Sequence, residues 1–335
     1  MALTVNGLLA DILGLDNLTQ RRAMAKAITL LESTRADHRV QADDLLTQLL
    51  PHTGNSLRIG LSGVPGVGKS TLIETLGLSL IERGHKVAVL AIDPSSSVSG
   101  GSILGDKTRM ERLSVHPSAF IRPSPSSGTL GGVAEKTREC MLVCEAAGYD
   151  IVIVETVGVG QSETAVAGMT DMFVLMQLPN AGDDLQAIKK GVMELADLIL
   201  INKADIDENA ATRAQSFIQS ALHLLGHHPS DSTLAWQAEV MRLSALNSSG
   251  LNELWEKVMR FQQLQTDGGR WLQRRQTQAL TWMNERIQSG LKDAFTQHAG
   301  VAAALSHMQQ EVLAGRIAAS TAARQLLALA SRPDT

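Results

Sequence analysis

The residues most clearly suited to chemistry form the segment GVPGVGKST at positions 63–71. It matches the pattern G-x-x-x-x-G-K-[ST], with Gly63, Gly68, Lys69 and Ser70 at the defining positions. Glycines let backbone N–H groups converge on phosphate oxygens, the lysine adds a cation, and the serine hydroxyl can bind Mg²⁺. An apolar stretch precedes the segment and a helix-like stretch follows it, as this loop requires. The sequence therefore predicts a nucleotide-phosphate site.

A second chemical segment, DIVIVETVGVGQSE, carries the acid Glu155 at the end of an apolar run. Proteins with this phosphate loop place a carboxylate of the Mg²⁺ shell at the end of such a strand. Gly158 can offer its N–H to a γ-phosphate, so that the loop after it responds to hydrolysis. Val159 stands where Ras-like GTPases have a water-orienting glutamine, and Gln161 lies two residues further on. We therefore expect slow hydrolysis unless another group or a partner completes the site.

The third segment, LILINKAD, places Asn202, Lys203 and Asp205 directly after an apolar run. It resembles the guanine-specificity motif N-K-x-D. A carboxylate there accepts hydrogen bonds from guanine N1–H and the exocyclic amine, whereas adenine offers no such donor pair. Four residues alone form a weak signal, since NKAD also suits a helix cap. Together with the phosphate loop, and with LSAL at 243–246, they favour GTP.

Two further acids occupy the segment that follows KVAVLAI. Asp93 ends this apolar run, and Asp106 lies further along the same Ser/Gly-rich stretch. Asp-Pro and Gly-Asp pairs are common in turns, so a purely structural role stays open for both. A place at the carboxyl end of a strand beside the phosphate loop favours Asp93 as a neighbour of Mg²⁺.

The elements that must position these residues are short apolar runs alternating with helix-like segments. Runs at 57–62, 86–92, 149–156, 171–178, 197–202 and 239–245 predict strands. Continuous apolar strands of this kind indicate an α/β P-loop NTPase fold, with a mostly parallel sheet covered by helices on both faces. Such a sheet binds ligands at the carboxyl ends of its strands, where all the motifs fall. Segments 93–109 and 122–132, rich in Gly, Ser and Pro, are expected to be loops.

Helical texture flanks this region on both sides. We expect an N-terminal helical segment over 1–50, a P-loop GTPase domain over 51–265 and a C-terminal helical segment over 266–335. The last segment carries an apolar stripe at helical spacing, formed by Leu280, Met283, Ile287, Leu291 and Ala294. The residues alone leave open whether this stripe packs within its own domain or forms a dimer interface.

The composition of the 335 residues is that of a globular protein, with 44% hydrophobic, 19% charged and 3% aromatic residues. A net charge of −4 argues against a nucleic-acid partner. No apolar run approaches the length that crosses a bilayer, which argues against a membrane partner. Two cysteines, Cys140 and Cys144, and the lack of a signal-peptide pattern fit a reducing compartment. We expect a soluble cytoplasmic protein.

Six long motifs together resemble the MeaB/ArgK family of GTPases, in the SIMIBI class of P-loop proteins. They are GVPGVGKST, AIDPSSSVSGGSILGDKTRM, RPSPSSGTLGGVA, VETVGVGQSE, LPNAGDDLQAIKKG and NKAD. The resemblance runs from about Leu57 to Leu246 and extends more loosely over the helical flanks.

The resemblance implies a GTP-hydrolysing chaperone of an adenosylcobalamin-dependent mutase, usually methylmalonyl-CoA mutase. GTP binding and hydrolysis then gate the loading of intact cofactor and help to protect the mutase. It also implies GTP or GDP and Mg²⁺ as ligands, and a homodimer held by C-terminal helices. The identity of the partner mutase stays open, as does a corrinoid adenosyltransferase as a further partner.

Carried onto this sequence, the resemblance implies three sets of residues. Those expected to hold the nucleotide are Gly63, Pro65, Gly66, Val67, Gly68, Lys69, Ser70, Thr71, Gly158, Asn202, Lys203, Asp205, Ser244, Ala245 and Leu246. Those expected near Mg²⁺ are Ser70, Asp93, Asp106 and Glu155. Those expected to assist catalysis are Lys69, Asp106, Glu155 and, from an additional switch loop at 180–191, Asp183 and Lys189.

Two other functions compete with this interpretation. A kinase or ATPase acting on amino-acid transport binding proteins needs a base for the acceptor hydroxyl, and no motif for one is present. A metal-insertion GTPase needs a cluster of Cys or His ligands. Cys140 and Cys144 lie away from an evident switch, and His227 and His228 have no ligand partners visible in the sequence.

Overall fold

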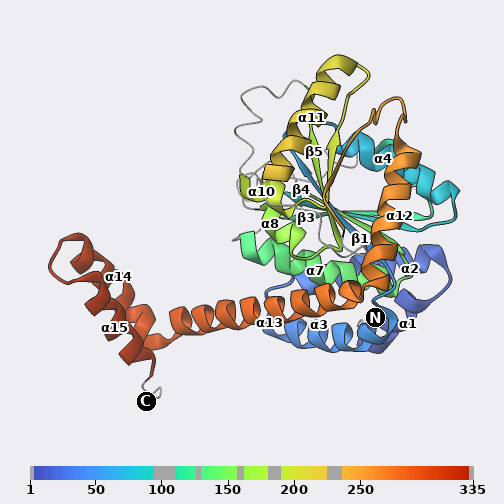
Figure 1. Cartoon of the computed structure of the whole chain (residues 1–335). Helices are drawn as coiled ribbons and strands as arrows, with labels where there is room; N and C mark the ends of the chain where they lie inside the picture. The colour runs from blue at the N-terminus through green and yellow to red at the C-terminus, as the bar shows by residue number, and fades with distance from the viewer. Residues whose placement is uncertain are drawn as a thin grey trace. The chain divides into compact units, whose positions relative to one another are not determined.

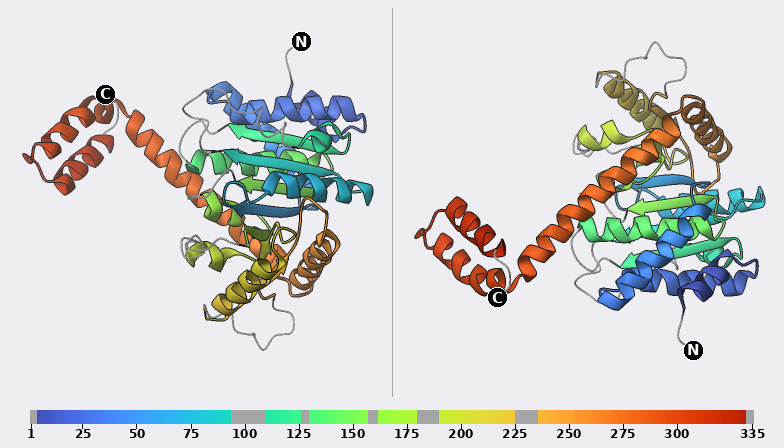
Figure 2. Two further views of the ribbon diagram at one scale, coloured as in Figure 1. Left: turned by 90° about the horizontal axis from the view of Figure 1, so that it is seen from above. Right: turned by 90° about the horizontal axis from the view of Figure 1, so that it is seen from below.

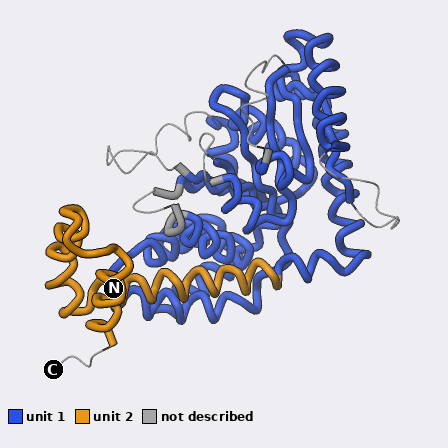
Figure 3. The backbone as a smooth tube through the Cα atoms, turned by 60° about the vertical axis from the view of Figure 1, so that its left-hand side comes forward, with its two compact units in different colours: residues 1–275 blue, residues 276–335 orange. Residues whose placement is uncertain are grey.

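The structure is a computed structural model that describes residues 4–93, 110–125, 130–156, 162–179, 190–224 and 236–331. The chain folds into two compact units, residues 1–275 and 276–335, coloured separately in Figure 3. Each unit is described by itself. Within the described ranges, no helix combines the length and apolar character that crossing a membrane requires.

The first unit is built on a seven-stranded sheet in which every pair of neighbouring strands is parallel (Figure 1). The strand order is β3-β2-β4-β1-β5-β6-β7. Strands rich in Val, Ile and Leu form the middle of the sheet because both of its faces are covered, which confirms the expected fold class. The strands are β1 (Leu57–Gly63), β2 (Val87–Asp93), β3 (Ala119–Pro125), β4 (Ile151–Thr156), β5 (Met172–Gln177), β6 (Leu198–Ile201) and β7 (Glu239–Arg242).

Helices cover both faces of the sheet, as the two views of Figure 2 show. Side chains alternate between the faces of a strand, so each face has its own apolar cluster. Val87 and Val89 of β2 lie in the cluster of α4 (Lys69–Glu82), α6 (Glu111–Val115) and α12 (Leu251–Asp267). Ala88 and Leu90 lie in the cluster of α7, α8, α10 and α11. These four helices span Leu130–Ala146, Ser162–Ala167, Lys190–Leu195 and Glu208–Leu224.

Three N-terminal helices extend the second of these clusters. They are α1 (Val5–Leu13), α2 (Asn17–Glu32) and α3 (Ala36–Leu49), followed by the short 3₁₀ helix η1 (Leu50–His52). The N-cap side chains Thr4 and Asp16 accept hydrogen bonds from the first turns of α1 and α2, at 3.3 and 2.9 Å. Ile12, Met24 and Leu45 are fully buried in the cluster that also contains α7. The N-terminal helices therefore share a core with the sheet.

Strand β3 was not expected from the sequence, and the predicted loop at 122–132 is partly wrong. Residues 122–125 belong to β3, and α7 already begins at Leu130. Val87 N donates to Ser118 O at 2.9 Å. The backbone N–H and C=O groups of the even-numbered residues of β3 therefore bond to β2, and those of the odd-numbered residues point away from β2. The nitrogen of Pro123 therefore points out of the sheet. Because β3 is an edge strand, a residue without an N–H is tolerated there.

A buried ion-pair network lies at the amino-terminal ends of the central strands. Arg275 makes two hydrogen bonds of 2.7 Å to Asp171, which also accepts from Arg58 N at 2.8 Å. The Arg58 guanidinium binds Glu145 at 2.6 and 3.0 Å. Burial raises the pKa of Glu145, but the bonds from Arg58, Ser56 and Gly54 outweigh it and hold that pKa below its ordinary value. The network therefore joins the starts of β1 and β5 to the helix that carries Arg275.

That helix, α13 (Arg270–Gln297), begins in the first unit and continues into the second. Next to Arg275, Arg274 lies 3.3 Å from the Asp197 carboxylate, which also accepts a 2.8 Å hydrogen bond from Phe173 N. Burial raises the pKa of Asp197, and Arg274 opposes this. In the second unit, α14 (Ala299–Leu313) and α15 (Ala319–Ala330) pack against each other.

Replacing Arg275 tests how much the network contributes to stability. We expect Arg275→Ala to lower the free energy of unfolding by about 3 kcal/mol, because it leaves the buried carboxylate of Asp171 without its strongest partner. Urea denaturation followed by circular dichroism measures the change. The control is Arg260→Ala, which removes an ion pair whose arginine is 67% exposed and should cost less than about 1 kcal/mol. Equal losses for the two variants would contradict the expectation.

Candidate nucleotide-binding site

The segment 63–71 connects the end of β1 to the first turn of α4, the strand-loop-helix arrangement expected for a phosphate loop. Lys69 begins the helix, and its Nζ donates to Gly63 O at 2.6 Å, so the cation lies over the loop. Among the described residues, no side chain caps the N-terminus of α4. Its first backbone N–H groups are therefore directed at a position where an anion can accept them, and the helix dipole favours negative charge there.

Glycine is required at position 68 for two reasons. The residue has a φ of 97°, in the left-handed region that other residues rarely adopt. A Cβ added there would also lie 2.5 Å from Asn202 Nδ2. The phosphate loop and the NKAD segment therefore approach each other too closely for any side chain at Gly68.

Asn202 joins three loops through one buried side chain, which is 2% exposed. Its Nδ2 donates to Val67 O at 2.7 Å, and its Oδ1 accepts from Ala245 N at 3.0 Å. Its own backbone N–H donates to Gln177 O at the end of β5. The asparagine thus holds the phosphate loop on one side and the loop after β7 on the other.

The two loops expected to read the base lie next to each other. Lys203 has a φ of 60°, and Ala204 N donates to Leu243 O at 3.1 Å. The loop after β7 is closed by paired backbone bonds between Ser244 and Ser249, at 3.0 and 3.1 Å. Asp205 is exposed at the end of NKAD. Leu246 is 77% exposed although it is apolar, so it offers a surface on which a ring can stack.

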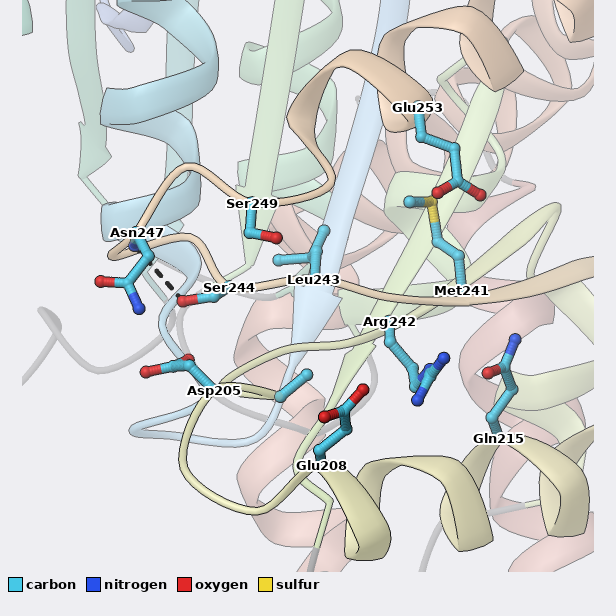
Figure 4. A pocket seen from close by; sticks show the side chains of 11 residues that line it. Asp205, Glu208, Gln215, Met241, Arg242, Leu243, Ser244, Asn247, Ser249 and Glu253 are labelled. Atoms are coloured by element: carbon cyan, nitrogen blue, oxygen red, sulfur yellow. Dashed lines mark hydrogen bonds between the residues drawn. The ribbon is translucent and has the colours of Figure 1, made fainter.

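A pocket of about 480 Å³ flanks these loops on the side of the edge strand β7 (Figure 4). Figure 4 shows Asp205 and Ser244 at one end of the pocket, and Gln215 and Glu253 at the other. The lining does not include Asn202, Lys203, Ala245 or Leu246. The Asp205 carboxylate also points away from Glu208 in this view. The pocket therefore shares Asp205 and Ser244 with the base-reading loops, and none of the described residues that line it belongs to the phosphate loop.

Glu155 lies on the same face of the sheet as α4. It is paired in register with Leu61 of β1, two residues before Gly63, and with Ala91 of β2. Ile151 and Ile153 of β4 belong to the cluster of α4, and Glu155 follows them with the same alternation. Glu155 is 2% exposed, so an acid is buried near the start of the helix that carries Ser70.

The structure describes only some of the remaining candidate acids and switch residues. Asp93 is the last residue of β2 and pairs in register with Pro125. Asp106, Gly158, Asp183 and Lys189 lie outside the described residues. Within the described part of the chain, no three His, Cys, Asp or Glu side chains are grouped closely enough to hold a metal ion. Cys140 and Cys144 are buried on α7, where burial raises the pKa of both thiols.

Two buried hydroxyl residues beside the site were not among the sequence candidates. Ser62 precedes the phosphate loop and Thr156 follows Glu155, and both are fully buried. A polar residue at the end of each apolar run was the only sequence signal for them, and it is not specific.

Comparison with known proteins gives a consistent result. The family described as methylmalonyl Co-A mutase-associated GTPase MeaB matches residues 24–299. The GTPase ArgK of Escherichia coli is 50% identical over 270 residues, with 80% of each chain covered. The mouse mitochondrial methylmalonic aciduria type A homolog is 46% identical over 319 residues, covering 92% of this chain and 76% of the mouse protein. A crystal structure described as a LAO/AO transport system kinase is 36% identical, with a TM-score of 0.75 and 98% of each chain covered.

Replacing Asn202 tests whether it holds the three loops together. Asn202→Ala leaves Val67 O and Ala245 N buried without a partner, at a cost of about 1–3 kcal/mol for each group. We expect weaker GDP binding, by at least roughly 10-fold, together with a lower urea midpoint. Fluorescent-GDP titration and urea denaturation measure the two effects. The control is Asn247→Ala on the exposed part of the neighbouring loop, and an equal loss of affinity there would show that Asn202 has no special role.

Proposed function

Because the chain belongs to the MeaB family of methylmalonyl Co-A mutase-associated GTPases, we propose that it is a nucleotide-switched chaperone of an adenosylcobalamin-dependent methylmalonyl-CoA mutase. The family resemblance seen in the sequence is thereby confirmed, and the chain binds guanine nucleotide and hydrolyses GTP. In the proposed role, hydrolysis gates the loading of intact cofactor into the mutase and protects it. The family match supports the choice of client, and the Asn202 contacts support the nucleotide-binding part of the proposal, because they bring the phosphate loop and the base-reading loops together.

The proposed binding of GTP divides between two sets of residues. Residues 63–71 surround the phosphates: their backbone N–H groups and the Lys69 ammonium offset the negative charge, and Thr71 continues the first turn of α4. The base lies between the NKAD segment and the loop at 244–246. There the Asp205 carboxylate accepts from the guanine N1–H and amine, and the Lys203 stem and Leu246 cover the ring faces. The exposure of Asp205 and Leu246 supports this arrangement.

Mg²⁺ is the proposed metal, and the donor set fits it. Ser70 offers a hydroxyl and Glu155 a carboxylate, both on the α4 side of the sheet, and oxygen donors are what Mg²⁺ prefers. Asp93 and Asp106 complete the proposed set, Asp93 from the end of β2 next to β4. When bound, the ion supplies charge neutralisation at the β- and γ-phosphates. Lys69 adds a second positive charge at the same phosphates.

The switch residues are proposed to link hydrolysis to the client. Gly158 follows Glu155 by three residues, so a contact between its N–H and the γ-phosphate would report the nucleotide state. Asp183 and Lys189, in the segment after β5, are the proposed catalytic assistants. They would supply what Val159 cannot, since a valine has no polar group to orient water. A client that orders this segment would then accelerate turnover.

A second copy of the chain is the proposed partner for the C-terminal helices. Leu280, Met283, Ile287 and Leu291 recur on one face of α13, and each is more than half exposed in the single chain. Four large apolar side chains in one stripe are costly to leave in water. We therefore assign dimerisation to the segment 266–335, after the GTPase domain over 51–265 and the N-terminal helices over 1–50. A corrinoid adenosyltransferase is a further proposed partner.

A kinase activity is the second candidate, because the similar solved structure is described as a transport system kinase. The two functions differ in the base that they require. ATP gives Asp205 no donor pair, whereas GTP does. ATP is therefore the control nucleotide in the experiments below.

Replacing Asp205 tests base recognition. We expect Asp205→Asn to weaken GTP binding by roughly 10- to 100-fold, because hydrogen bonds to a charged group contribute about 1.5–3 kcal/mol. The same variant should gain affinity for xanthosine nucleotides, which present an acceptor where guanine has its amine. Competition against fluorescent GDP measures both affinities. Glu208→Gln, on another exposed acid at the start of α11, is the matched control. Unchanged GTP affinity in Asp205→Asn would contradict the assignment.

Turnover with and without the client tests the chaperone role. We expect slow GTP hydrolysis by the chain alone, and an increase of roughly 10-fold or more when methylmalonyl-CoA mutase completes the site. Phosphate release is measured with GTP and with ATP, using a co-encoded mutase. Lys69→Ala is the control and should abolish turnover in both conditions. Fast hydrolysis that ignores the mutase, or equal use of ATP, would count against the proposed function.

A further inference from the structure

A buried hydrogen bond ties the end of β4 to the end of β1. Thr156 Oγ1 donates to Ser62 Oγ at 2.9 Å, and both side chains are fully buried. Thr156 directly follows Glu155, and Ser62 directly precedes Gly63 of the phosphate loop. The bond therefore lies between the two segments that supply the phosphate loop and the acid next to it.

The pair lies on the opposite face of the sheet from the acid. Glu155 projects to the α4 side, so Thr156, one residue later, projects to the side of α7 and α8. There the preceding residue of the same alternation, Val154, is apolar and lies in that face's core cluster. The hydroxyls of Thr156 and Ser62 come next along these strands. Burying them removes their hydrogen bonds to water, a cost that valine and alanine side chains would not have. Their mutual bond offsets that loss and fixes both strand ends at one separation.

A second contact places the neighbouring helix on the same strand. A Cβ on Gly60 of β1 would lie 2.6 Å from Val166 Cγ1 and 2.7 Å from Thr170 Oγ1. Val166 belongs to α8, the first helix after β4. Gly60 and Ser62 lie on one face of β1, because they are two residues apart. The chain before residue 157 and the chain after residue 161 are therefore both held against β1.

We infer that Thr156 is a positioning residue for GTP hydrolysis. Its hydroxyl holds the end of β4 in register with β1, and so sets the position of the Glu155 carboxylate relative to Ser70 and Lys69 at the start of α4. The inference rests on the proposed role of Glu155 beside Mg²⁺. Loss of the hydroxyl removes this side-chain tie between β4 and β1, while the Glu155 carboxylate and the backbone pairing of Thr156 with Ile92 of β2 remain.

The first test compares Thr156→Val with Thr156→Ser in steady-state GTP hydrolysis over a range of Mg²⁺ concentrations. Valine keeps the shape of threonine without the hydroxyl, and serine keeps the hydroxyl. We expect Thr156→Val to lower kcat by roughly 10-fold, since a displacement of about 1 Å can cost roughly 100-fold. The Mg²⁺ concentration for half-maximal rate should rise, and so should the Mg²⁺ concentration for half-maximal binding of a non-hydrolysable GTP analogue, while KM for GTP stays within about twofold. Thr156→Ser should restore most of the rate.

Two controls separate positioning from general loss of stability. Ile153→Val removes one buried methylene from the same strand on its other face, and it should leave kcat and the Mg²⁺ requirement unchanged. Ser62→Ala removes the other half of the pair and should reproduce the Thr156→Val effect. The double variant should then be no worse than either single one, because both remove the same bond. Additive losses, or no rescue by serine, would overturn the inference.

Glu155→Gln distinguishes this inference from the metal assignment on which it rests. If Glu155→Gln raises the Mg²⁺ requirement and Thr156→Val does not, the positioning role is wrong and the metal assignment stands. If Glu155→Gln leaves the Mg²⁺ requirement unchanged, the metal assignment and the positioning role both fail. If both variants raise it, with Thr156→Val the milder, the positioning role is supported.

Discussion

The amide of Asn202 can satisfy both of its buried hydrogen bonds only when two distant loops lie on either side of it. One bond reaches Val67 in the phosphate loop and the other reaches Ala245 after β7. An amide buried without partners is costly, so these two bonds stabilise the three segments in this arrangement. The absence of a side chain at Gly68 makes this approach possible. The Asn202 side chain therefore fixes the positions of the phosphate loop and of the loop after β7 relative to the NKAD segment.

The amino-terminal and carboxyl-terminal ends of the strands carry different kinds of polar groups, and β1 runs from one end to the other. At the amino-terminal ends, Arg58 of β1 binds Glu145, and its backbone N–H binds Asp171. There the charges are paired with one another and enclosed. At the carboxyl-terminal ends of the strands, β1 ends at Gly63, and the phosphate loop leads to the start of α4, whose first backbone N–H groups donate to no capping side chain among the described residues. The ion pairs fix the start of β1, and this helps to hold the phosphate loop at the end of the same strand in one conformation.

Under the proposed function, a single chain lacks a group that orients the attacking water, and it leaves the apolar stripe of α13 exposed. Val159 occupies the position that orients water in Ras-like enzymes, and the apolar stripe of α13 is exposed. A client that supplies the missing catalytic help and a second copy that covers the stripe are different partners, acting on different segments. This separation explains how such a GTPase could remain a dimer throughout its cycle while its turnover depends on the client.

Taken by itself, the sequence determined the features that consecutive residues encode. The phosphate loop, the NKAD segment and the long apolar strands were recognisable because phosphate binding, base reading and buried strands each depend on residues a few positions apart. The tertiary structure alone decided which of these segments meet. The bond from Asn202 to Val67 spans 135 residues and that from Thr156 to Ser62 spans 94, and no local pattern indicates either. Strand β3 was missed for the same reason, since Pro123 argues against a strand unless its place at the sheet edge is known. Motifs with a chemical role depend on residues that are close in sequence, whereas the relative positions of these motifs depend on contacts that form only when the chain has folded.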